Sequence, residues 1–483
     1  MRAALLEHLS RLLPDPGERG AFLDHMSFPA PPSVRVNPLM PQAPQLRKAC
    51  AAIGGGVPWS PDVFALDRSE DRLGTALEHL LGGFYIQAKA ATLAVAVLDP
   101  QPGERVLDLA AAPGGKSTQI AAAMENGGLL VANEPNRRRL AALAGNLERC
   151  GVHNCVLTQA PGTLLARYFH NCFDRVLLDV PCSGDGILRK DEGVLRYWSP
   201  EDAANKSGQQ LGLARAAFHM LRPGGTLVYS SCSLSTEENE EVLLALLRTY
   251  PEQAEVAPVE QPDLGPPLPR DAASGYPDSF RGMARVWPHR QHTEGACVAR
   301  VRKLGATAWK AVEGNTGVLQ PTPASTADRS LLENLEERWG FRAPLPGDCT
   351  LTAAPRQLQV RPRSWEAFAD LPFYVRSGMK AASIHKGHPY LTHQAATLWG
   401  NGMKRRLLAL EWADARALFA GREIGLGGRT VEPGEVLLRH GPWALGRGLV
   451  GAAGSLTGFL PRALRTEALT KLRDWGGVEE LGT

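Results

Sequence analysis

The sequence predicts an α/β protein whose central sheet is doubly wound and mostly parallel, with a small module before it and domains of a different kind after it. From about residue 84, short apolar segments alternate with helical patterns, which is typical of a parallel sheet covered by helices on both faces. Residues 173–179 are almost continuously apolar, as a strand buried on both faces is. Near the C-terminus, residues 435–438 and 443–450 are expected to be strands joined by a turn at Gly441-Pro442.

Length and composition divide the chain into several units. A chain of 483 residues is too long for one compact domain, and 44% hydrophobic with 21% charged residues is ordinary for globular proteins. The expected units are an N-terminal module (1–78), the α/β domain (79–304), a linker (305–325), a basic domain (326–414) and a small β-rich domain (415–483).

Cysteine usage and hydropathy indicate a reducing, aqueous compartment. Eight cysteines in a chain of this length do not suggest a disulfide framework. Glu7 and His8 interrupt the apolar run that a signal peptide would need, and no run of 18 apolar residues predicts a membrane helix. We therefore expect a cytoplasmic protein with free thiols and no membrane partner.

Positive charge is concentrated in the C-terminal part of the chain. Residues 371–483 hold 15 Lys and Arg against 9 Asp and Glu, whereas the whole chain has a net charge of only +3. A segment of this kind suits a polyanionic partner, although an ordinary solvated face has the same composition. Within residues 371–406 there is no acid, and the bases are Arg376, Lys380, Lys386, Lys404, Arg405 and Arg406.

The elements of the α/β domain follow one another in order. Helices are expected at 87–98, 116–124 and 136–149, and strands at 105–109, 128–134, 154–158, 173–179 and 226–231. A long helix should begin at Ser199-Pro200, which supply a capping side chain and a first-turn proline. Ser235 and Glu238 have the spacing of a capping box, so the next helix is expected to open at Ser235. Residues 254–280 are expected to be a long loop, and residues 296–302 an antiparallel edge strand.

A loop of small residues follows the first of these strands and precedes a helix. Such residues let a ligand approach the backbone closely. A Walker loop would need glycine where Ala110 stands, and the G-x-G-x-x-G motif of nicotinamide oxidoreductases is absent. The loop therefore favours a ligand that has an adenosine but no phosphate. Its residues are Ala110, Ala111, Ala112, Pro113, Gly114, Gly115 and Lys116.

An acidic residue ends the next strand. Glu134 lies 20 residues after Gly114, where a carboxylate can accept hydrogen bonds from both ribose hydroxyls. The alternative is a charge at the start of the following helix, since Pro135-Asn136 come next. Together with the loop, Glu134 favours ribose binding, and S-adenosylmethionine meets both requirements.

Two cysteines come directly after two apolar strands. Asp179 ends one strand and Cys182 follows it, whereas Cys232 follows the next strand. Ligands bind at the carboxyl ends of strands in open α/β sheets, so we expect both thiols and the carboxylate in one crevice. Either cysteine alone could be a buried apolar side chain, but the combination favours an active site.

These groups suit methyl transfer to C5 of cytosine. Addition of a thiolate to C6 makes C5 nucleophilic enough to take a methyl group from a sulfonium. A helix N-terminus just after Cys232 would stabilise the thiolate, and Asp179 could bind the exocyclic amine and N3. A second cysteine could assist release, and the residues themselves leave open which cysteine attacks.

A metal site is not expected. Cys150, His153 and Cys155 could suggest one, but their spacing is irregular and no second Cys/His pair lies close in the sequence. Cys155 also falls on an expected strand.

The motifs that contain these residues resemble the Sun-domain (NSUN-type) RNA cytosine-C5 methyltransferases. The resemblance covers about residues 30–303 and rests on the sequences DLAAAPGGKSTQ, DVPCSGDG and YSSCSLSTEENE. Further similar segments lie at 35–37, 83–87 and 285–295. The resemblance implies a Rossmann-like class I methyltransferase fold that uses S-adenosylmethionine.

The resemblance also assigns roles to the site residues. It implies that Cys232 attacks and Cys182 releases, with cofactor contacts along Ala110–Lys116, at Glu134 and at Asp179. The chain departs from the family pattern in three places. Ala110 replaces a cysteine, Pro161-Gly162 replaces the Asp-Gly beside the adenine, and Ala296-Cys297 replaces an aromatic pair.

The C-terminal half resembles the bacterial F group of small-subunit rRNA methyltransferases, which ends in a PUA-like RNA-binding module. This resemblance implies 16S rRNA as the partner of a monomeric enzyme, either free or within the 30S subunit, and an N-terminal module that also binds RNA. The alternatives are a tRNA-modifying enzyme of the same family and a non-catalytic RNA-binding assembly factor. The expected RNA contacts are Arg189, Lys190, Arg376, Lys380, Lys404, Arg405 and Arg406.

Overall fold

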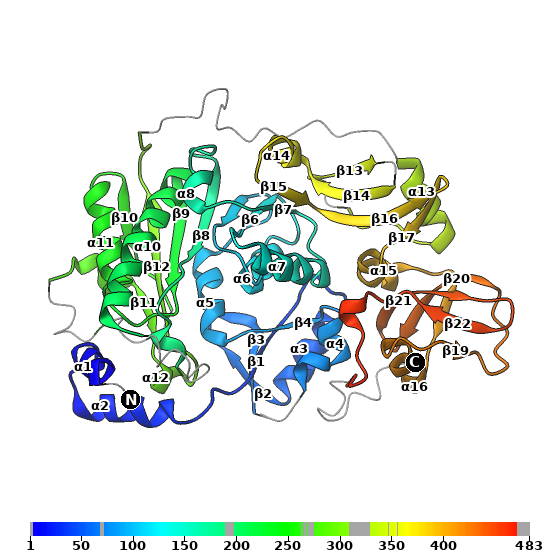
Figure 1. The fold of residues 1–483 in the computed structure, drawn as a ribbon, viewed down its shortest axis with the longest axis horizontal. Coiled ribbons are helices and arrows are strands. Elements are labelled where there is room, and N and C mark those ends of the chain that lie inside the picture. The colour runs from blue at the N-terminus through cyan, green and yellow to red at the C-terminus, as the bar shows by residue number, and fades with distance from the viewer. Residues whose placement is uncertain are drawn as a thin grey trace.

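The computed structural model describes residues 3–67, 72–188, 198–261, 264, 268, 275–308, 329–345, 347–354 and 356–470. Figure 1 shows a large sheet with its helices at one end of the molecule and the last, small sheet at the other end. The N-terminal sheet lies between them. Arg189, Lys190 and residues 309–325 of the expected linker lie outside the described residues.

The large sheet confirms the predicted α/β class. In the described part of the chain its order is β10-β12-β9-β8-β5-β6-β7-β15, and β11 pairs with β12. Strands β5 to β9 are parallel to their neighbours within that group, whereas β10, β11, β12 and β15 pair antiparallel. The strands are β5 (Arg105–Asp108), β6 (Leu129–Asn133), β7 (Cys155–Thr158), β8 (Phe173–Asp179), β9 (Leu221–Ser231), β10 (Ala254–Ala257), β11 (Ala284–Val286), β12 (Ala296–Lys303) and β15 (Tyr374–Ser377).

Helices cover both faces of this sheet. Apolar side chains of α5, α6 and α7 pack against one face, and those of α8, α10 and α11 pack against the other. The predicted start of the long helix is confirmed, because the Ser199 hydroxyl accepts a hydrogen bond from Asp202 N at 3.1 Å. The helices are α5 (Lys89–Leu98), α6 (Gly115–Ala123), α7 (Arg137–Arg149), α8 (Gly162–Leu165), α10 (Pro200–Met220) and α11 (Glu240–Thr249).

The N-terminal residues form a helical pair and a sheet ordered β2-β3-β1-β4. Helix α2 packs against the short helix α12 (Pro288–Gln291) of the large domain, as Figure 1 shows at lower left. The elements are α1 (Ala3–Leu12), α2 (Pro16–Met26), β1 (Ser33–Val36), α3 (Ala43–Ala51), β2 (Gly54–Val57), β3 (Ser60–Leu66), α4 (Leu77–Leu80) and β4 (Phe84–Ile86).

Two buried side chains, Arg35 within β1 and Asn37 just after it, join the N-terminal sheet to the large domain. Arg35 donates hydrogen bonds to Gln87 Oε1 at 3.1 Å and to Thr118 Oγ1, on α6, at 2.8 Å. The Asn37 amide donates to the backbone oxygens of Gly82 at 2.8 Å and of Cys150 at 3.0 Å. Hydrogen bonds therefore connect the N-terminal module to Thr118 in α6 and to Cys150 at the end of α7.

The C-terminal residues form two further sheets, ordered β13-β14-β16-β17 and β18-β20-β21-β22-β19. The second of these shares its core with the N-terminal sheet. The elements are α13 (Arg329–Trp339), β13 (Cys349–Ala354), β14 (Gln357–Pro362), α14 (Glu366–Ala369), β16 (Met379–His385), β17 (His388–Leu391), α15 (His393–Trp399), β18 (Leu407–Ala409), α16 (Trp412–Phe419), β19 (Ile424–Gly425), β20 (Gly434–His440), β21 (Trp443–Val450) and β22 (Ser455–Gly458).

Three local predictions are wrong. The helix expected at Ser235 begins at Glu240, because the Ser235 hydroxyl contacts Asp185 and His8 instead of capping a helix. Residues 254–257, expected to belong to a loop, form β10. As a result, β12 is antiparallel but not an edge strand, since β9 pairs on one side and β10 and β11 on the other.

No helix in the described part of the chain is long and apolar enough to cross a membrane.

We predict that Asn37→Asp weakens the junction between the N-terminal sheet and the large domain. Asn37 is only 2% exposed, and an aspartate would place acceptor oxygens against two backbone oxygens. A loss of about 3 kcal/mol in the free energy of unfolding is expected, measured by chemical denaturation. Gln45→Glu, the same change at an exposed position of α3, should leave stability within about 0.5 kcal/mol. Equal stability of the two variants would contradict this role.

Candidate active site

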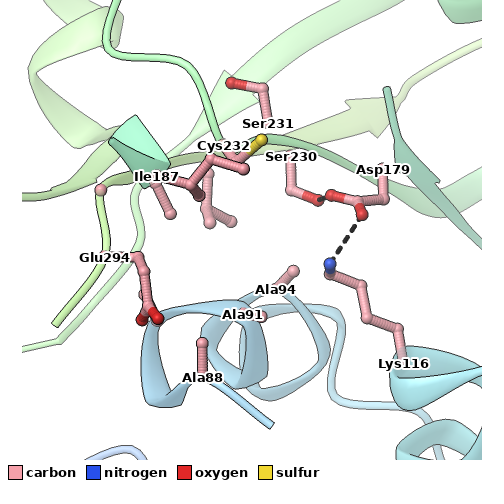
Figure 2. A pocket seen from close by; sticks show the side chains of 14 residues that line it. Ala88, Ala91, Ala94, Lys116, Asp179, Ile187, Ser230, Ser231, Cys232 and Glu294 are labelled. Carbon is pink, nitrogen blue, oxygen red and sulfur yellow. Dashed lines mark hydrogen bonds and ion pairs between the residues drawn. The ribbon is translucent and has the colours of Figure 1, made fainter. Parts of the chain in front are cut away.

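A cavity of about 410 Å³ opens where β8 and β9 end, and this volume is typical of small-molecule sites. Figure 2 shows Cys232 on one side of it, the Asp179–Lys116 pair on a second side and Glu294 across from that pair, with α5 beneath. The cavity therefore lies at the carboxyl ends of the parallel strands, where ligands bind in such sheets. Its lining residues are Ala88, Ala90, Ala91, Ala94, Lys116, Asp179, Ile187, Ser230, Ser231, Cys232, Glu294, Gly295, Ala296 and Val298.

The structure brings the two predicted cysteines into contact. Strands β8 and β9 pair in parallel with Asp179 opposite Ser230, so the residues that follow them leave the sheet together. The Sγ atoms of Cys182 and Cys232 are 2.9 Å apart, and both side chains are half-buried free thiols. The hydrogen bond with Cys232, together with burial, raises the pKa of Cys182 well above its usual value. Cys182 is thus held as a thiol beside the sulfur of Cys232.

Asp179 is held by two donors at the wall of the cavity. Its Oδ2 accepts from Lys116 Nζ at 2.7 Å, and its Oδ1 accepts from the Ser230 hydroxyl at 2.7 Å. Burial disfavours the Lys116 ammonium, but the negative charges of Asp179, Asp108 and Cys232 outweigh this effect and raise the pKa of Lys116. Lys116 therefore brings a fixed positive charge to the cysteine pair.

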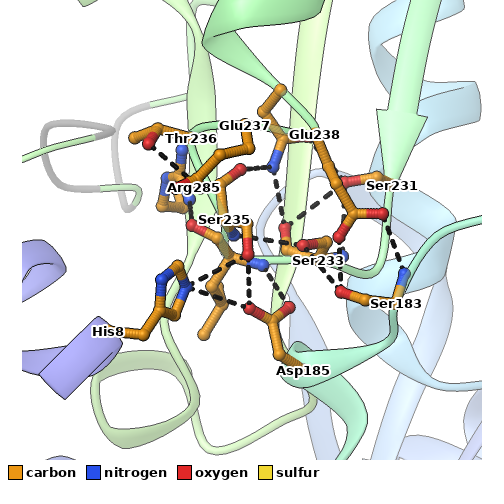
Figure 3. Close-up of polar contacts among 12 residues, drawn as sticks. His8, Ser183, Asp185, Ser231, Ser233, Ser235, Thr236, Glu237, Glu238 and Arg285 are labelled. Atoms are coloured by element: carbon orange, nitrogen blue, oxygen red, sulfur yellow. Dashed lines mark hydrogen bonds and ion pairs between the residues drawn. The ribbon is translucent and has the colours of Figure 1, made fainter. Parts of the chain in front are cut away.

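The segment after Cys232 is an irregular loop fixed by buried hydrogen bonds, and the helix that follows it, α11, begins only at Glu240. Asp185 accepts from Leu234 N at 2.7 Å and from the Ser235 hydroxyl at 3.0 Å, and His8 reaches the same pair (Figure 3). The Asn239 amide donates to Ser233 O at 3.0 Å and to Ser235 O at 2.7 Å. The expected helix N-terminus therefore does not stabilise the thiolate. Positive charge near the cysteines comes from the Lys116 ammonium, which binds Asp179, and from the Lys206 ammonium, which binds Cys182 O.

The small-residue loop connects β5 to α6, as predicted. Gly114 has φ +108°, and a Cβ there would lie 3.1 Å from Leu143, so only glycine fits without strain. The loop backbone is bonded to its neighbours, with Asn133 Nδ2 donating to Leu109 O at 3.0 Å and Arg139 donating to Ala112 O at 2.6 Å. At the end of β5, burial raises the pKa of Asp108 to about 7 while the Ser117 hydroxyl hydrogen-bonds it.

Glu134 follows β6 and is 1% exposed. Its Oε1 accepts from Asn136 N at 2.9 Å, whereas its Oε2 has no hydrogen-bond partner among the described residues. Arg139 forms an ion pair with Oε2, with its Nη1 atom at 3.5 Å. A buried carboxylate oxygen of this kind costs free energy unless a donor reaches it, so it fits a ligand with a hydroxyl group.

Pro161-Gly162, which stand where the family has Asp-Gly, are closely packed against neighbouring side chains. Pro161 precedes α8, and a Cβ on Gly162 would lie 2.8 Å from Leu213 and 3.1 Å from Leu109. The glycine keeps its steric role, while Pro161 offers no side-chain hydrogen bond to an adenine.

The expected RNA contacts divide into two groups. Arg376 forms an ion pair with Glu148 of α7 and donates to Ala144 O at 2.9 Å, so it joins β15 to the large domain. Lys380, Lys404, Arg405 and Arg406 are exposed.

Several polar residues of the site were missed by sequence reasoning. Lys206 donates to Cys182 O at 3.2 Å, and Gln210 donates to Pro181 O at 2.9 Å, both from α10. Glu238 contacts the Cys182 segment, and Glu294 lines the cavity. Gln210 falls on an unremarkable helical segment, but Glu238 and Glu294 stand in the quoted motifs and could have been weighed as site residues.

The described residues contain no group of three or more His, Cys, Asp and Glu side chains placed to hold a metal ion.

Comparisons with known proteins identify the family. The model of the 16S rRNA methyltransferase RsmB/F family matches residues 95–302, and that of the N-terminal domain of 16S rRNA methyltransferase RsmF matches residues 1–89. The chain is 36% identical to a ribosomal RNA small subunit methyltransferase F of Klebsiella pneumoniae, over 88% of this chain and 87% of the relative. A protein of the same name from Vibrio atlanticus is 33% identical over 92% and 93%.

A solved structure adds a match in three dimensions. A methyltransferase homolog protein from Pyrococcus horikoshii superposes with a TM-score of 0.52 at 30% identity, covering 63% of this chain and all of that one. With the cysteine pair, the small-residue loop and Glu134 in place, the chain belongs to the RsmB/F family of S-adenosylmethionine-dependent RNA methyltransferases.

Proposed function

We propose that this enzyme transfers a methyl group to C5 of cytosine in 16S rRNA, with Cys232 as the nucleophile and Cys182 as the residue that assists release. The observation that carries the proposal is the pair of sulfur atoms 2.9 Å apart beside the Asp179–Lys116 ion pair. The relatives named as small-subunit rRNA methyltransferases supply the substrate class. The proposed setting is a monomer acting in the cytoplasm on the rRNA, free or within the 30S subunit.

The cofactor would be held by the loop Ala110–Lys116 and by Glu134. Bound S-adenosylmethionine supplies an electrophilic methyl group. Oε2 of Glu134 is buried and accepts no hydrogen bond from the described residues, so it suits a ribose hydroxyl. The absence of a side chain at Gly114 would let the ligand approach the peptide groups of the loop. Asp179, which faces the cavity from β8, would lie between cofactor and base.

Cys232 and the ion pair beside it would act on the cytosine ring. The Cys232 thiolate forms a bond to C6, and the displaced electron pair makes C5 nucleophilic. Asp179 accepts from the exocyclic amine, and the nearby Lys116 ammonium stabilises the thiolate before attack. Once C5 is methylated, its proton passes to solvent, the C6–Sγ bond breaks and the bonding pair returns to the sulfur of Cys232.

RNA would be bound by the appended domains. The exposed Lys380, Lys404, Arg405 and Arg406 supply positive charge for phosphate groups, and Arg189 and Lys190 remain further candidates. Addition at C6 needs access to the face of the ring, so the target cytosine must be unstacked or unpaired. The N-terminal module and the small β-rich domain, which share one core, would form a single RNA-binding unit.

We predict opposite effects for the two cysteines. Cys232→Ala should abolish methyl transfer, on the order of a thousand-fold or more, because no bond to C6 can form. Cys182→Ala should still attack the base but release it slowly, so that an RNA–protein adduct resistant to denaturation accumulates. Methylation is measured with radiolabelled cofactor and 16S rRNA, and the adduct by denaturing electrophoresis.

The matched control is Cys349→Ala, a half-buried thiol on β13 outside the cavity, which should behave as the parent enzyme. Methyl transfer that survives Cys232→Ala would overturn the assignment.

A second prediction concerns the cofactor. Glu134→Gln should weaken S-adenosylhomocysteine binding about 10- to 100-fold, because hydrogen bonds to a charged group contribute about 1.5–3 kcal/mol. Isothermal titration calorimetry measures the affinity, and the exposed Glu252→Gln serves as control. Unchanged affinity in Glu134→Gln would exclude the carboxylate from the ribose site.

A further inference from the structure

Glu238 is a fully buried acid close to the catalytic thiols. It lies six residues after Cys232 in the sequence, and its exposed fraction is 0%. Figure 3 shows its carboxyl group between Ser183 and the loop that follows β9. Burying a carboxylate costs free energy unless donors surround it, so its contacts explain how it is tolerated.

Three donors converge on this carboxylate. Oε1 accepts from Ser183 N at 2.9 Å and from Gln210 Nε2 at 2.9 Å, and Oε2 accepts from the Ser183 hydroxyl. Gln210 in turn donates to Pro181 O at 2.9 Å. One side chain from the Cys232 segment therefore binds Ser183 directly and reaches Pro181 through Gln210, so that it holds the chain on both sides of Cys182.

The charged and titratable groups that face Cys182 come from the ends of β8 and β9, from the loop after β9 and from α10. Negative charge is contributed by Asp179 at the end of β8 and by Glu238, whereas the Lys206 ammonium contacts the Cys182 backbone oxygen from α10. The remaining neighbours are the Cys232 thiol and the Tyr229 hydroxyl, which donates to Glu238 O. The pKa of Cys182 is raised by the hydrogen bond with Cys232, by burial, by the charge of Cys232, and then by the negative charges of Glu238 and Asp179.

The Glu238 carboxylate offers two acceptor oxygens to these three donors, whereas a glutamine amide would offer one, and it binds them more strongly at a larger desolvation cost. Its negative charge also acts on its neighbours, because it contributes to the raised pKa of the Cys182 thiol and to that of the Tyr229 hydroxyl. We propose that Glu238 is a positioning residue that acts through Cys182, fixing its segment against that of Cys232 and keeping Cys182 as a thiol that donates toward the Cys232 sulfur.

For the release step, the inference rests on the proposed function. When the C6–Sγ bond breaks, the electron pair stays on Cys232, and the Cys182 thiol passes its proton to that sulfur. The C5 proton goes to water, Cys182 recovers a proton from solvent, and Cys232 gives the proton that it received to solvent, so both cysteines return to their starting states. This gives a physical reason for the roles of the two cysteines, because Cys182, held as a thiol, is the proton donor and Cys232 is the nucleophile.

The first experiment measures how readily Cys182 ionises, without RNA. Iodoacetamide alkylation of Cys182 is followed against pH by peptide mass spectrometry in the full-length Cys232→Ser protein, where no neighbouring thiol competes. Adding Glu238→Gln should move the alkylation midpoint to lower pH, because the nearly isosteric amide keeps the packing but removes the charge. The matched control is Glu237→Gln, a half-buried neighbour outside these contacts, which should leave the midpoint in place. If Glu238→Gln fails to fold, Glu238→Asp retains the charge on a shorter side chain, farther from the Cys182 segment, and its midpoint should lie below that of the Cys232→Ser protein; an unmoved midpoint would again overturn the inference.

The second experiment measures release with 16S rRNA in the presence of both cysteines. Between the two alkylation midpoints, Glu238→Gln should accumulate a denaturation-resistant adduct as Cys182→Ala does, while the parent enzyme and Glu237→Gln do not. An unmoved midpoint would overturn the inference, and so would a moved midpoint without the adduct. If Cys182→Ala itself gives no adduct, the proposed function fails in its division of roles, while the alkylation result still decides whether Glu238 controls the thiol.

Discussion

The contact between two sulfur atoms at the ends of neighbouring strands is the constraint on which the site depends. Pairing of β8 with β9, with Asp179 opposite Ser230, leaves Cys182 and Cys232 with their Sγ atoms 2.9 Å apart. Two thiolates at that distance would repel strongly, so the two sulfur atoms are not expected to be ionised together. One thiolate beside one thiol is the state that addition to a base and later release both require.

The surroundings of the pair distribute charge between the two sulfurs. Lys116 brings a positive charge next to Asp179 on the side of Cys232, whereas Glu238 brings a negative charge to the segment of Cys182. The loop after Cys232 contributes no helix N-terminus and is held by side chains, with Asp185 and Asn239 bonded to its backbone. His8 reaches this loop from α1, so the N-terminal module contacts the segment that carries the nucleophile.

Much of the fold and of the site could be predicted, because the pattern of apolar residues marks the strands and the place of a residue just after a strand puts it at the site. The apolar segment 173–179, the loop before Lys116 and the cysteines after two strands are local patterns, and each lies where the sequence placed it. The helix start at Ser235 could not be predicted, since Asp185 and His8, distant in sequence, take the Ser235 hydroxyl. The roles of Gln210 and Arg376 were equally hidden, because both depend on tertiary neighbours, Pro181 for Gln210 and Glu148 for Arg376.

The most direct test of the account is the identity of the cysteine that becomes bonded to RNA. A 16S rRNA fragment containing 5-fluorocytidine would trap the parent enzyme after methylation, because fluorine at C5 cannot leave as a proton does. Nuclease and protease digestion followed by mass spectrometry then locates the nucleotide. The account predicts a methylated 5-fluorocytidine on the peptide that contains Cys232. A nucleotide on Cys182, or a methylated product with no covalent attachment, would contradict it.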